Sequence, residues 1–146
     1  MRAETKPFEI LLAEDNSDDV ALVRQALRGH HVDCVLHVIG DGEEAIEWIT
    51  SRDADPKAPP LDLVILDMHL PKRDGDDVLK RLRSTRQYAE TPVVVMTSLD
   101  STVLEDRAAS RGPVVHFRKP SSLGEFMRLG SIIRRVLGQE EVGAAT

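Results

Sequence analysis

Five short, mainly apolar runs punctuate the chain, and polar, turn-forming residues separate them. The runs at 63–66 and 93–96 contain no polar residue. An unbroken apolar run of this length between turn signals is typical of a strand buried on both faces. Such strands belong to parallel sheets that helices cover on both sides. The runs at 8–13, 32–39 and 114–117 complete a predicted set of five strands.

Between these runs, the apolar spacing changes to that of helices. Val20, Val23 and Leu27 recur at helical spacing after Asn16 or Ser17, and either of these two residues can cap the start of a helix. Further helices are predicted over 41–49, after Asp74 and Gly75, over 101–111, and from Ser121 or Ser122 to about Leu137. Strands that alternate with helices form a parallel sheet with right-handed crossovers. We therefore predict a doubly wound α/β fold with a five-stranded parallel sheet and five helices.

The length of 146 residues is sufficient for one domain with a substantial core. We expect this domain at 8–137, with an N-terminal extension at 1–7 and a flexible tail at 138–146. The single cysteine excludes an internal disulfide and fits a reducing compartment. No apolar run approaches the roughly 20 residues of a membrane span. The net charge of −6 disfavours nucleic acid and anionic membranes, so we expect a cytoplasmic protein that binds neither.

Polar side chains stand at the carboxyl ends of four predicted strands. These residues are Glu14, Asp15, Asp67, Thr97, Ser98 and Lys119. In a doubly wound fold these strand ends share one edge of the sheet, so the side chains can converge on a single pocket. Asp67 alone could merely begin a turn, and the combination is what predicts a site.

The residue types in this set favour phosphoryl chemistry. Carboxylates packed together repel each other unless a cation lies among them, and an all-oxygen ligand set suits Mg²⁺. A hydroxyl and an ammonium aimed at the same point suit the oxygens of a phosphoryl group. A carboxylate can itself accept a phosphoryl group and form an aspartyl phosphate. We therefore expect Mg²⁺ as a cofactor.

Taken together, these residues resemble the motif set of a known family, the CheY-like receiver domains of two-component response regulators. The resemblance includes Leu70-Pro71 and Asp74-Gly75 after the central Asp, and Pro120 after the Lys. It covers 8–137 and implies a flavodoxin-like fold. It also implies a phosphorelay switch, not an enzyme in the usual sense, that catalyses its own phosphorylation and dephosphorylation. Because only nine residues follow Leu137, we expect a stand-alone receiver that signals through its own surface.

The resemblance assigns roles to the acidic residues. Asp67 would be the phosphoacceptor, receiving its phosphoryl group from a histidine of a sensor kinase. Asp15 and Asp67 would bind Mg²⁺ directly and Glu14 through water, and the backbone carbonyl of His69 would complete the protein ligands. The imidazole of His69 either influences the lifetime of the aspartyl phosphate or is an exposed bystander.

The resemblance also assigns the residues around the phosphoryl group. Thr97, with Ser98 next to it, would bond a phosphoryl oxygen and move when the acceptor is modified. Lys119 would pair with the phosphoryl group. A cis peptide bond would precede Pro120, and X–Pro bonds are the ones in which cis is cheap.

One position departs from the family pattern. Three residues before the lysine, family members usually have Tyr or Phe, whose ring turns inward on activation, whereas this chain has His116 followed by Phe117. Either His116 takes over this gate, or Phe117 does so through a local shift, or the aromatic relay is absent. Burial of an imidazole favours its neutral form, so a His116 gate would make signalling sensitive to pH.

Two features suggest partners. In the last predicted helix the apolar residues spread over more of the circumference than one buried face needs. We therefore predict a homodimer through the last helix and strand, with Phe126, Leu129, Ile132 and Ile133 on its surface. The proline-rich loop at 53–60 resembles small regulators that partner bacteriophytochrome-type sensor kinases.

Three alternative functions remain to be weighed. A pseudo-receiver would bind partners without phosphorylation, but it has no need for Asp67, Thr97 and Lys119 together. A phosphatase of the aspartyl-phosphate type usually has a second Asp two residues after its nucleophile, where this chain has His69. A relay intermediate that passes phosphate to a histidine phosphotransfer protein has the same sequence features as a terminal switch.

Overall fold

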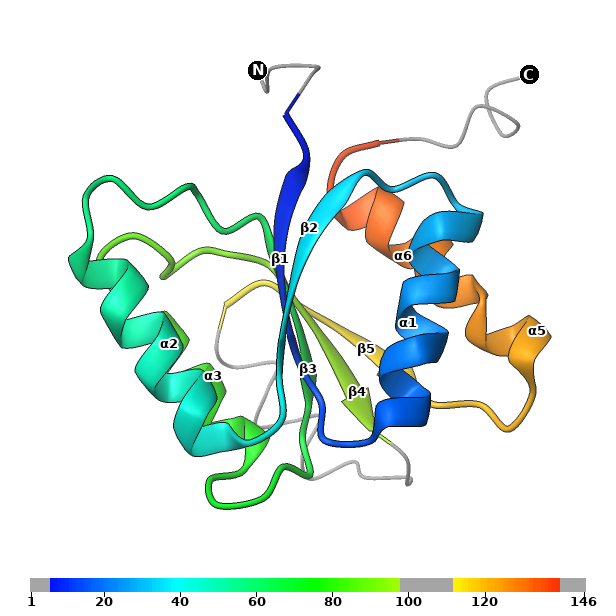
Figure 1. Cartoon of the computed structure of the whole chain (residues 1–146), viewed down its shortest axis with the longest axis horizontal. Helices are drawn as coiled ribbons and strands as arrows, with labels where there is room; N and C mark the ends of the chain where they lie inside the picture. The colour runs from blue at the N-terminus through cyan, green and yellow to red at the C-terminus, as the bar shows by residue number, and fades with distance from the viewer. Residues whose placement is uncertain (1–5, 98–111, 140–146) are drawn as a thin grey trace.

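The computed structural model describes residues 6–97 and 112–139 (Figure 1). Its strands are β1 (Phe8–Ala13), β2 (Cys34–Ile39), β3 (Leu63–Asp67), β4 (Val93–Thr97) and β5 (Val114–Arg118). Its helices are α1 (Ser17–Gly29), α2 (Gly42–Ala54), α3 (Gly75–Arg83), α5 (Leu123–Phe126) and α6 (Arg128–Val136). Ser98 and the helix predicted over 101–111 lie outside the described residues.

The five strands form one parallel sheet in the order β2-β1-β3-β4-β5. All residues of β3 and β4 are buried, as their unbroken apolar runs predict. The strand order reverses between β1 and β3, and open α/β sheets place their ligands outside the strand ends at this point. The predicted doubly wound fold is confirmed.

Helices cover both faces of the sheet, with α1, α5 and α6 on one face and α2 and α3 on the other (Figure 1). Side chains of each central strand alternate between the two layers. Val64 and Val95 pack with α2 and α3, whereas Ile65 and Val94 pack with α1 and α6. The two buried layers hold the strand ends rigidly at the edge where the polar residues gather.

Local polar contacts fix where the helices begin. The side chain of Asn16 caps α1 and accepts hydrogen bonds from the backbone N–H groups of Asp18 and Asp19. Helix α2 runs to Ala54, beyond the predicted end at residue 49. Its last turn is held because the Arg52 guanidinium lies over the Trp48 ring, 4.7 Å from its centroid.

The last helix differs from the prediction in two ways. It consists of α5 and α6, separated by a tightened turn in which Gly130 N–H bonds to the Met127 carbonyl at 3.1 Å. Phe126, Leu129 and Ile133 are at most 1% exposed and belong to the core beside α1. The predicted dimer surface is therefore wrong for these three residues. Both α1 and the sheet pack against α5 and α6, so the buried part of these helices is wider than a single contact face.

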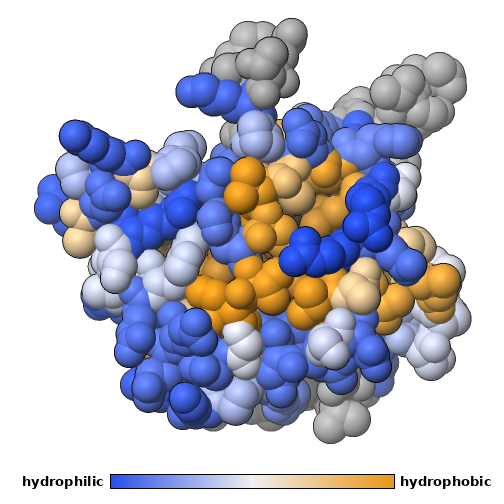
Figure 2. Space-filling view, viewed as in Figure 1, coloured by the Kyte–Doolittle hydropathy of each residue, from blue (hydrophilic) through white to orange (hydrophobic). Residues whose placement is uncertain are grey.

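The exposed large apolar side chains are Leu123 of α5 at 55%, Val115 of β5 at 37%, and two residues of the edge strand β2. Val35 and Val38 are 40% and 39% exposed. The hydrophobic region in the centre of Figure 2 lies where β2 crosses the view in Figure 1. In the described part of the chain, no helix has the length and apolar character needed to cross a membrane.

Candidate functional site

The register between β1 and β3 places two acidic residues side by side. Ala13 pairs with Leu66 across the two parallel strands. The next residues along the strands are Glu14 and Asp67, which therefore leave the sheet at the same level. Both are buried, with 2% and 5% of their surface exposed. The carboxylates converge because the register of two apolar strands is fixed by their burial.

The register between β4 and β5 adds the hydroxyl and the ammonium. Thr97 pairs with Arg118, so Lys119 follows immediately at the strand end. The backbone N–H of Lys119 donates a 2.8 Å hydrogen bond to the Thr97 carbonyl. Thr97 is 4% exposed and lies one residue beyond Met96, the partner of Asp67 in β3. The structure thus brings together the described members of the predicted set.

Three carboxylates offer ligand atoms for a cation. One oxygen each of Glu14, Asp15 and Asp67 lies within 4.8 Å of the others. The first and last are buried, whereas Asp15 is exposed to solvent. Hard oxygen donors at a partly open site fit a divalent cation such as Mg²⁺, which keeps several water ligands.

The ammonium of Lys119 is the centre of the site. Its Nζ donates hydrogen bonds to Glu14 Oε1 at 2.8 Å, to Asp19 Oδ2 at 2.8 Å and to Asp67 Oδ2 at 3.2 Å. The lysine side chain is only 12% exposed. Charge-assisted hydrogen bonds of this kind hold the ammonium within reach of any group attached to Asp67.

Asp19 is a member of the site that the sequence pattern did not indicate. It lies in the first turn of α1, where an acidic residue is already explained by the helix dipole. Its contact with Lys119 joins residues 100 positions apart in the chain. The only local signal was its location just after a strand end that carries other acids.

The surroundings change the acidity of two groups. Burial raises the pKa of Glu14 to about 7; the negative charge of Asp67 adds to this effect and hydrogen bonding to Lys119 opposes it. Burial also disfavours the charged form of Lys119, but the hydrogen bonds that it donates to Asp19 and Glu14 outweigh this effect and raise its pKa. A divalent cation would offset the cost of ionising this buried carboxyl beside another carboxylate, so the residues fit a divalent metal.

Backbone groups orient Asp67 for reaction. His69 N–H donates a 2.9 Å hydrogen bond to Asp67 Oδ1, so each carboxylate oxygen has a defined partner. Gly75 lies directly under this turn, where a Cβ would be 2.8 Å from the Asp67 carbonyl oxygen and 2.6 Å from Met68 Cα. The Asp-Gly pair therefore lets the start of α3 approach the strand end closely.

The two candidate gate residues lie on opposite faces of β5. Phe117 is 7% exposed and packs edge-on against Phe126, with ring centroids 5.7 Å apart, in the layer of α1 and α6. His116 points to the opposite layer, because it pairs with Val95 and neighbouring residues of a strand alternate between faces. Within the described residues, both ring nitrogens of His116 are buried without a hydrogen-bond partner. The three interpretations of the gate stay predictions, and Phe117 would have to leave the layer of α1 and α6 to act as the gate.

The predicted cis peptide before Pro120 is wrong for this structure. The Lys119–Pro120 bond is trans, as are the other peptide bonds in the described ranges. The trans form of an X–Pro bond is favoured by about 0.5–1 kcal/mol, and the sequence around a proline does not override this preference by itself. The Lys119 side chain reaches the carboxylates from the trans backbone.

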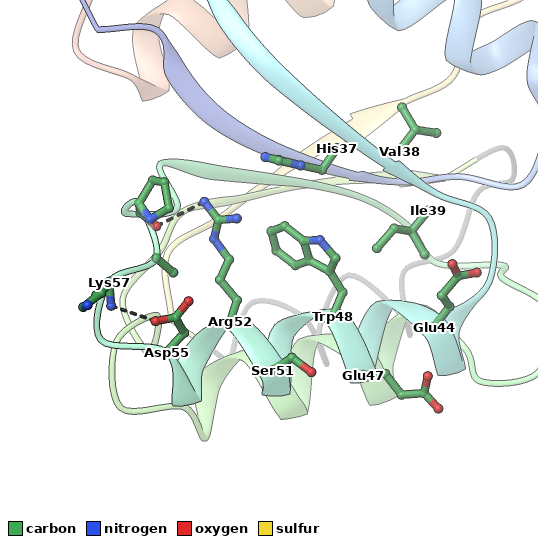
Figure 3. Close-up of a pocket in the computed structure, with 12 residues that line it drawn as sticks. His37, Val38, Ile39, Glu44, Glu47, Trp48, Ser51, Arg52, Asp55 and Lys57 are labelled. Atoms are coloured by element: carbon green, nitrogen blue, oxygen red, sulfur yellow. Dashed lines mark hydrogen bonds between the residues drawn. The ribbon is translucent and has the colours of Figure 1, made fainter.

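A separate groove of about 800 Å³ lies between β2 and α2 (Figure 3). Two of its lining residues, His37 and Arg52, contact Glu9 Oε1 through His37 Nε2 and the Arg52 guanidinium, both at 2.8 Å. Trp48 rises from α2 beside Arg52 toward β2, with its ring 5.1 Å from that of His37. None of Glu14, Asp15, Asp67 and Lys119 lines this groove, so it is separate from the acidic cluster at the strand ends.

Comparisons with known proteins agree with this geometry. Residues 10–129 match the model of the response regulator receiver domain family. Response regulator Rcp1 of Synechocystis sp. is 34% identical over 92 residues, which are 63% of this chain and 63% of Rcp1. The transcriptional regulatory protein TrcR of Mycobacterium tuberculosis is 33% identical over 135 residues, which are 92% of this chain but only 48% of TrcR. The chain thus spans half to two thirds of these relatives.

Solved structures give the same result. The crystal structure of the phosphorylated cyanobacterial phytochrome response regulator RcpA superposes with a TM-score of 0.78 at 26% identity, covering 97% of this chain and 98% of RcpA. The Mn²⁺-bound form of Rcp1 has a TM-score of 0.76 at 26% identity, covering 88% of this chain and 92% of that one.

Proposed function

Because the chain belongs to the response regulator receiver domain family, we propose that it is a phosphorylation-controlled switch that accepts a phosphoryl group on Asp67. The observation that carries this proposal is the convergence of Asp67, Lys119 and Glu14 in one hydrogen-bonded site. A binding module without phosphoryl chemistry would not need a buried carboxylate, 5% exposed, aligned with a buried ammonium.

The geometry supports in-line transfer to a carboxylate oxygen. The bond between phosphorus and the leaving group of the donor would break, and its electron pair would leave with that group. A new bond would form from an Asp67 oxygen to phosphorus. Lys119 would stabilise the charge on the phosphoryl oxygens, and Thr97, at the adjacent strand end, would supply a hydroxyl.

The acidic cluster completes the proposed site. Glu14, Asp15 and Asp67 would hold Mg²⁺, whose charge neutralises phosphoryl oxygens in sites of this kind. The Mn²⁺-bound structure of Rcp1 supports a divalent metal here. The backbone carbonyl of His69 remains a proposed ligand, and its N–H already bonds to Asp67.

We further propose a sensor histidine kinase of the phytochrome class as the phosphodonor. The similarity to RcpA, a cyanobacterial phytochrome response regulator, supports this partner. Phosphotransfer from a purified, autophosphorylated phytochrome-type kinase, compared with a kinase of unrelated sensor class, tests it. Equal rates from both donors would contradict the assignment. Retention of phosphate when a histidine phosphotransfer protein is added would favour a terminal switch over a relay intermediate.

The acceptor itself is tested by intact mass after incubation with acetyl phosphate and Mg²⁺. The wild type should gain the mass of one phosphoryl group, and Asp67→Asn should gain none. Asp18→Asn, which changes an exposed acid nearby, is the matched control and should behave like the wild type. Equal gain in Asp67→Asn would place the acceptor elsewhere, and no gain in the wild type with Mg²⁺ bound would favour the pseudo-receiver.

The predicted homodimer now has less support, because only Ile132 of the four proposed residues is partly exposed. It stays a prediction that sedimentation of the phosphorylated and unphosphorylated chain would test. A concentration-independent monomer in both forms would contradict it.

A further inference from the structure

Asp19 reaches the phosphoryl site from a helix, outside the set of strand-end residues. Its Oδ2 accepts a hydrogen bond from Lys119 Nζ at 2.8 Å, and its carboxylate is 22% exposed. The Asn16 cap fixes its backbone, because the Asp19 N–H donates to Asn16 Oδ1 at 3.2 Å. The first turn of α1 thus holds a third carboxylate against the ammonium, beside those of Glu14 and Asp67.

The donors of Lys119 are fully used in this arrangement. An ammonium has three N–H groups, and Glu14, Asp19 and Asp67 accept one each. The two shorter bonds lead to Glu14 and Asp19, and the longer one, at 3.2 Å, leads to Asp67. A phosphoryl oxygen that bonds to Lys119 must therefore displace or share with one of these acceptors.

The three acceptors differ in how easily they can give up the ammonium. The side chain of Glu14 is fully buried, so its separation from Lys119 would leave a buried carboxyl without this hydrogen-bond partner and away from water. Asp67 carries the reacting group itself. Asp19 lies at the rim and can turn its carboxylate into water. It is the acceptor that costs least to displace.

We propose that Asp19 is a positioning residue that competes with the incoming phosphoryl group for Lys119. This inference rests on the proposed function. Before transfer, Asp19 and Glu14 draw the ammonium away from Asp67, and four carboxylates face an anionic donor. During transfer from acetyl phosphate, the P–O bond to the acetyl group breaks, acetate takes the electron pair, and Asp67 forms the new P–O bond. Displacement of Asp19 frees one N–H of Lys119 for the transferred group.

The test is the phosphorylation rate of Asp19→Asn in the full-length chain at saturating Mg²⁺ and low acetyl phosphate. Asparagine keeps a hydrogen-bond acceptor of the same shape but removes the charge that competes with the donor. We expect the rate to rise about tenfold, the factor that corresponds to the lower end of values for hydrogen bonds to charged groups. Asp18→Asn removes one charge from the neighbouring residue, which is exposed, and should stay within about twofold of the wild type.

A second donor separates this effect from a general structural change. Phosphoramidate carries less negative charge than acetyl phosphate at neutral pH, so competition by a carboxylate should affect it less. The ratio of variant to wild-type rate should be larger with acetyl phosphate. A purely structural effect of Asp19→Asn would change both rates by the same factor.

The outcomes distinguish this inference from the proposed function. No phosphorylation of the wild type would overturn both. Phosphorylation of the wild type with an unchanged or lower rate in Asp19→Asn would overturn the role of Asp19 alone. Equal ratios for the two donors would also overturn it. A rate increase in Asp19→Asn that is larger with acetyl phosphate than with phosphoramidate would support it, provided that Asp18→Asn shows no such increase.

Discussion

The guanidinium of Arg134 donates a 2.9 Å hydrogen bond to the backbone carbonyl of His30, so α6 satisfies the carboxyl end of α1. The contact requires the two helices to approach closely. They do so at Gly130, where a Cβ would lie 2.5 Å from the Ala26 carbonyl oxygen and 2.2 Å from the His30 ring. This interface keeps the layer behind Phe117 in place.

Gly130→Ala should therefore destabilise the protein, although alanine is the better helix former. We expect a loss of about 1–3 kcal/mol in the free energy of unfolding, the usual cost of overpacking. Gly124→Ala is the matched control, since nothing lies within 4 Å of its Cβ position in α5, and it should be neutral or slightly stabilising. Urea unfolding of both variants measures the difference, and equal midpoints would contradict this packing.

Gly42→Ala should disturb the loop that follows Asp67. A Cβ at Gly42 would lie 1.7 Å from the carbonyl oxygen of Arg73, and its N–H bonds to the Pro71 carbonyl at 3.1 Å. Because a backbone atom cannot move away cheaply, we expect a cost of about 2 kcal/mol or more. Gly40→Ala, which meets nothing within 4 Å, should leave unfolding unchanged. A similar cost in both variants would point to loss of glycine flexibility instead.

The pKa of Glu14, raised to about 7, predicts how stability and metal binding depend on pH. The raised pKa means that the protonated carboxyl favours the folded state. This contribution is complete below the usual value of 4.5 and is lost as the pH rises through about 7. Metal-free protein should therefore lose stability over this range. Mg²⁺ affinity should rise over the same range, because the ligand must be ionised.

Thermal unfolding between pH 5 and about 8, with and without Mg²⁺, measures both effects. Glu14→Gln should flatten the pH dependence of the metal-free protein and weaken the stabilisation by Mg²⁺. Glu43→Gln, an exposed acid in α2, is the matched control and should keep the wild-type profile. The same pH dependence in Glu14→Gln and wild type would show that another group titrates.

Glu9 should make the stability depend on pH in the opposite direction to Glu14, so that stability falls as the pH becomes acid. Burial disfavours its charged form, but the hydrogen bonds from His37 and Arg52 prevail and lower its pKa. Its contribution to stability is present above the usual value of 4.5 and is lost as the pH falls through the lowered pKa. Glu9→Gln should cost about 1 kcal/mol or more at pH 7, and the difference from the wild type should vanish in acid.

Glu47→Gln is the matched control for this prediction. Glu47 is an exposed acid on α2 that lines the groove between β2 and α2 together with His37 and Arg52. It should leave both the stability at pH 7 and the acid profile unchanged. Urea unfolding at several pH values compares the two variants. A constant difference between Glu9→Gln and wild type down to low pH would mean that packing, not charge, is lost.

The sequence by itself determined the sheet and which residues lie at the strand ends. The runs at 63–66 and 93–96 had to be central strands, because only a doubly covered position buries both faces of an unbroken apolar run. The fold then required Asp67, Thr97 and Lys119 to share one edge. These inferences depend on patterns of two to six neighbouring residues, and contacts between distant parts of the chain do not change what such patterns indicate.

The tertiary structure decided what depends on neighbours distant in the chain. Leu129 and Ile133 are core residues because α1 and the sheet both cover α6, a geometry that helical spacing alone does not contain. Only the register of β5 with β4 showed that Phe117 and His116 face opposite layers of the fold. Asp19 entered the site because α1 begins beside Lys119, and no pattern within α1 distinguishes that acid from one that serves the helix dipole.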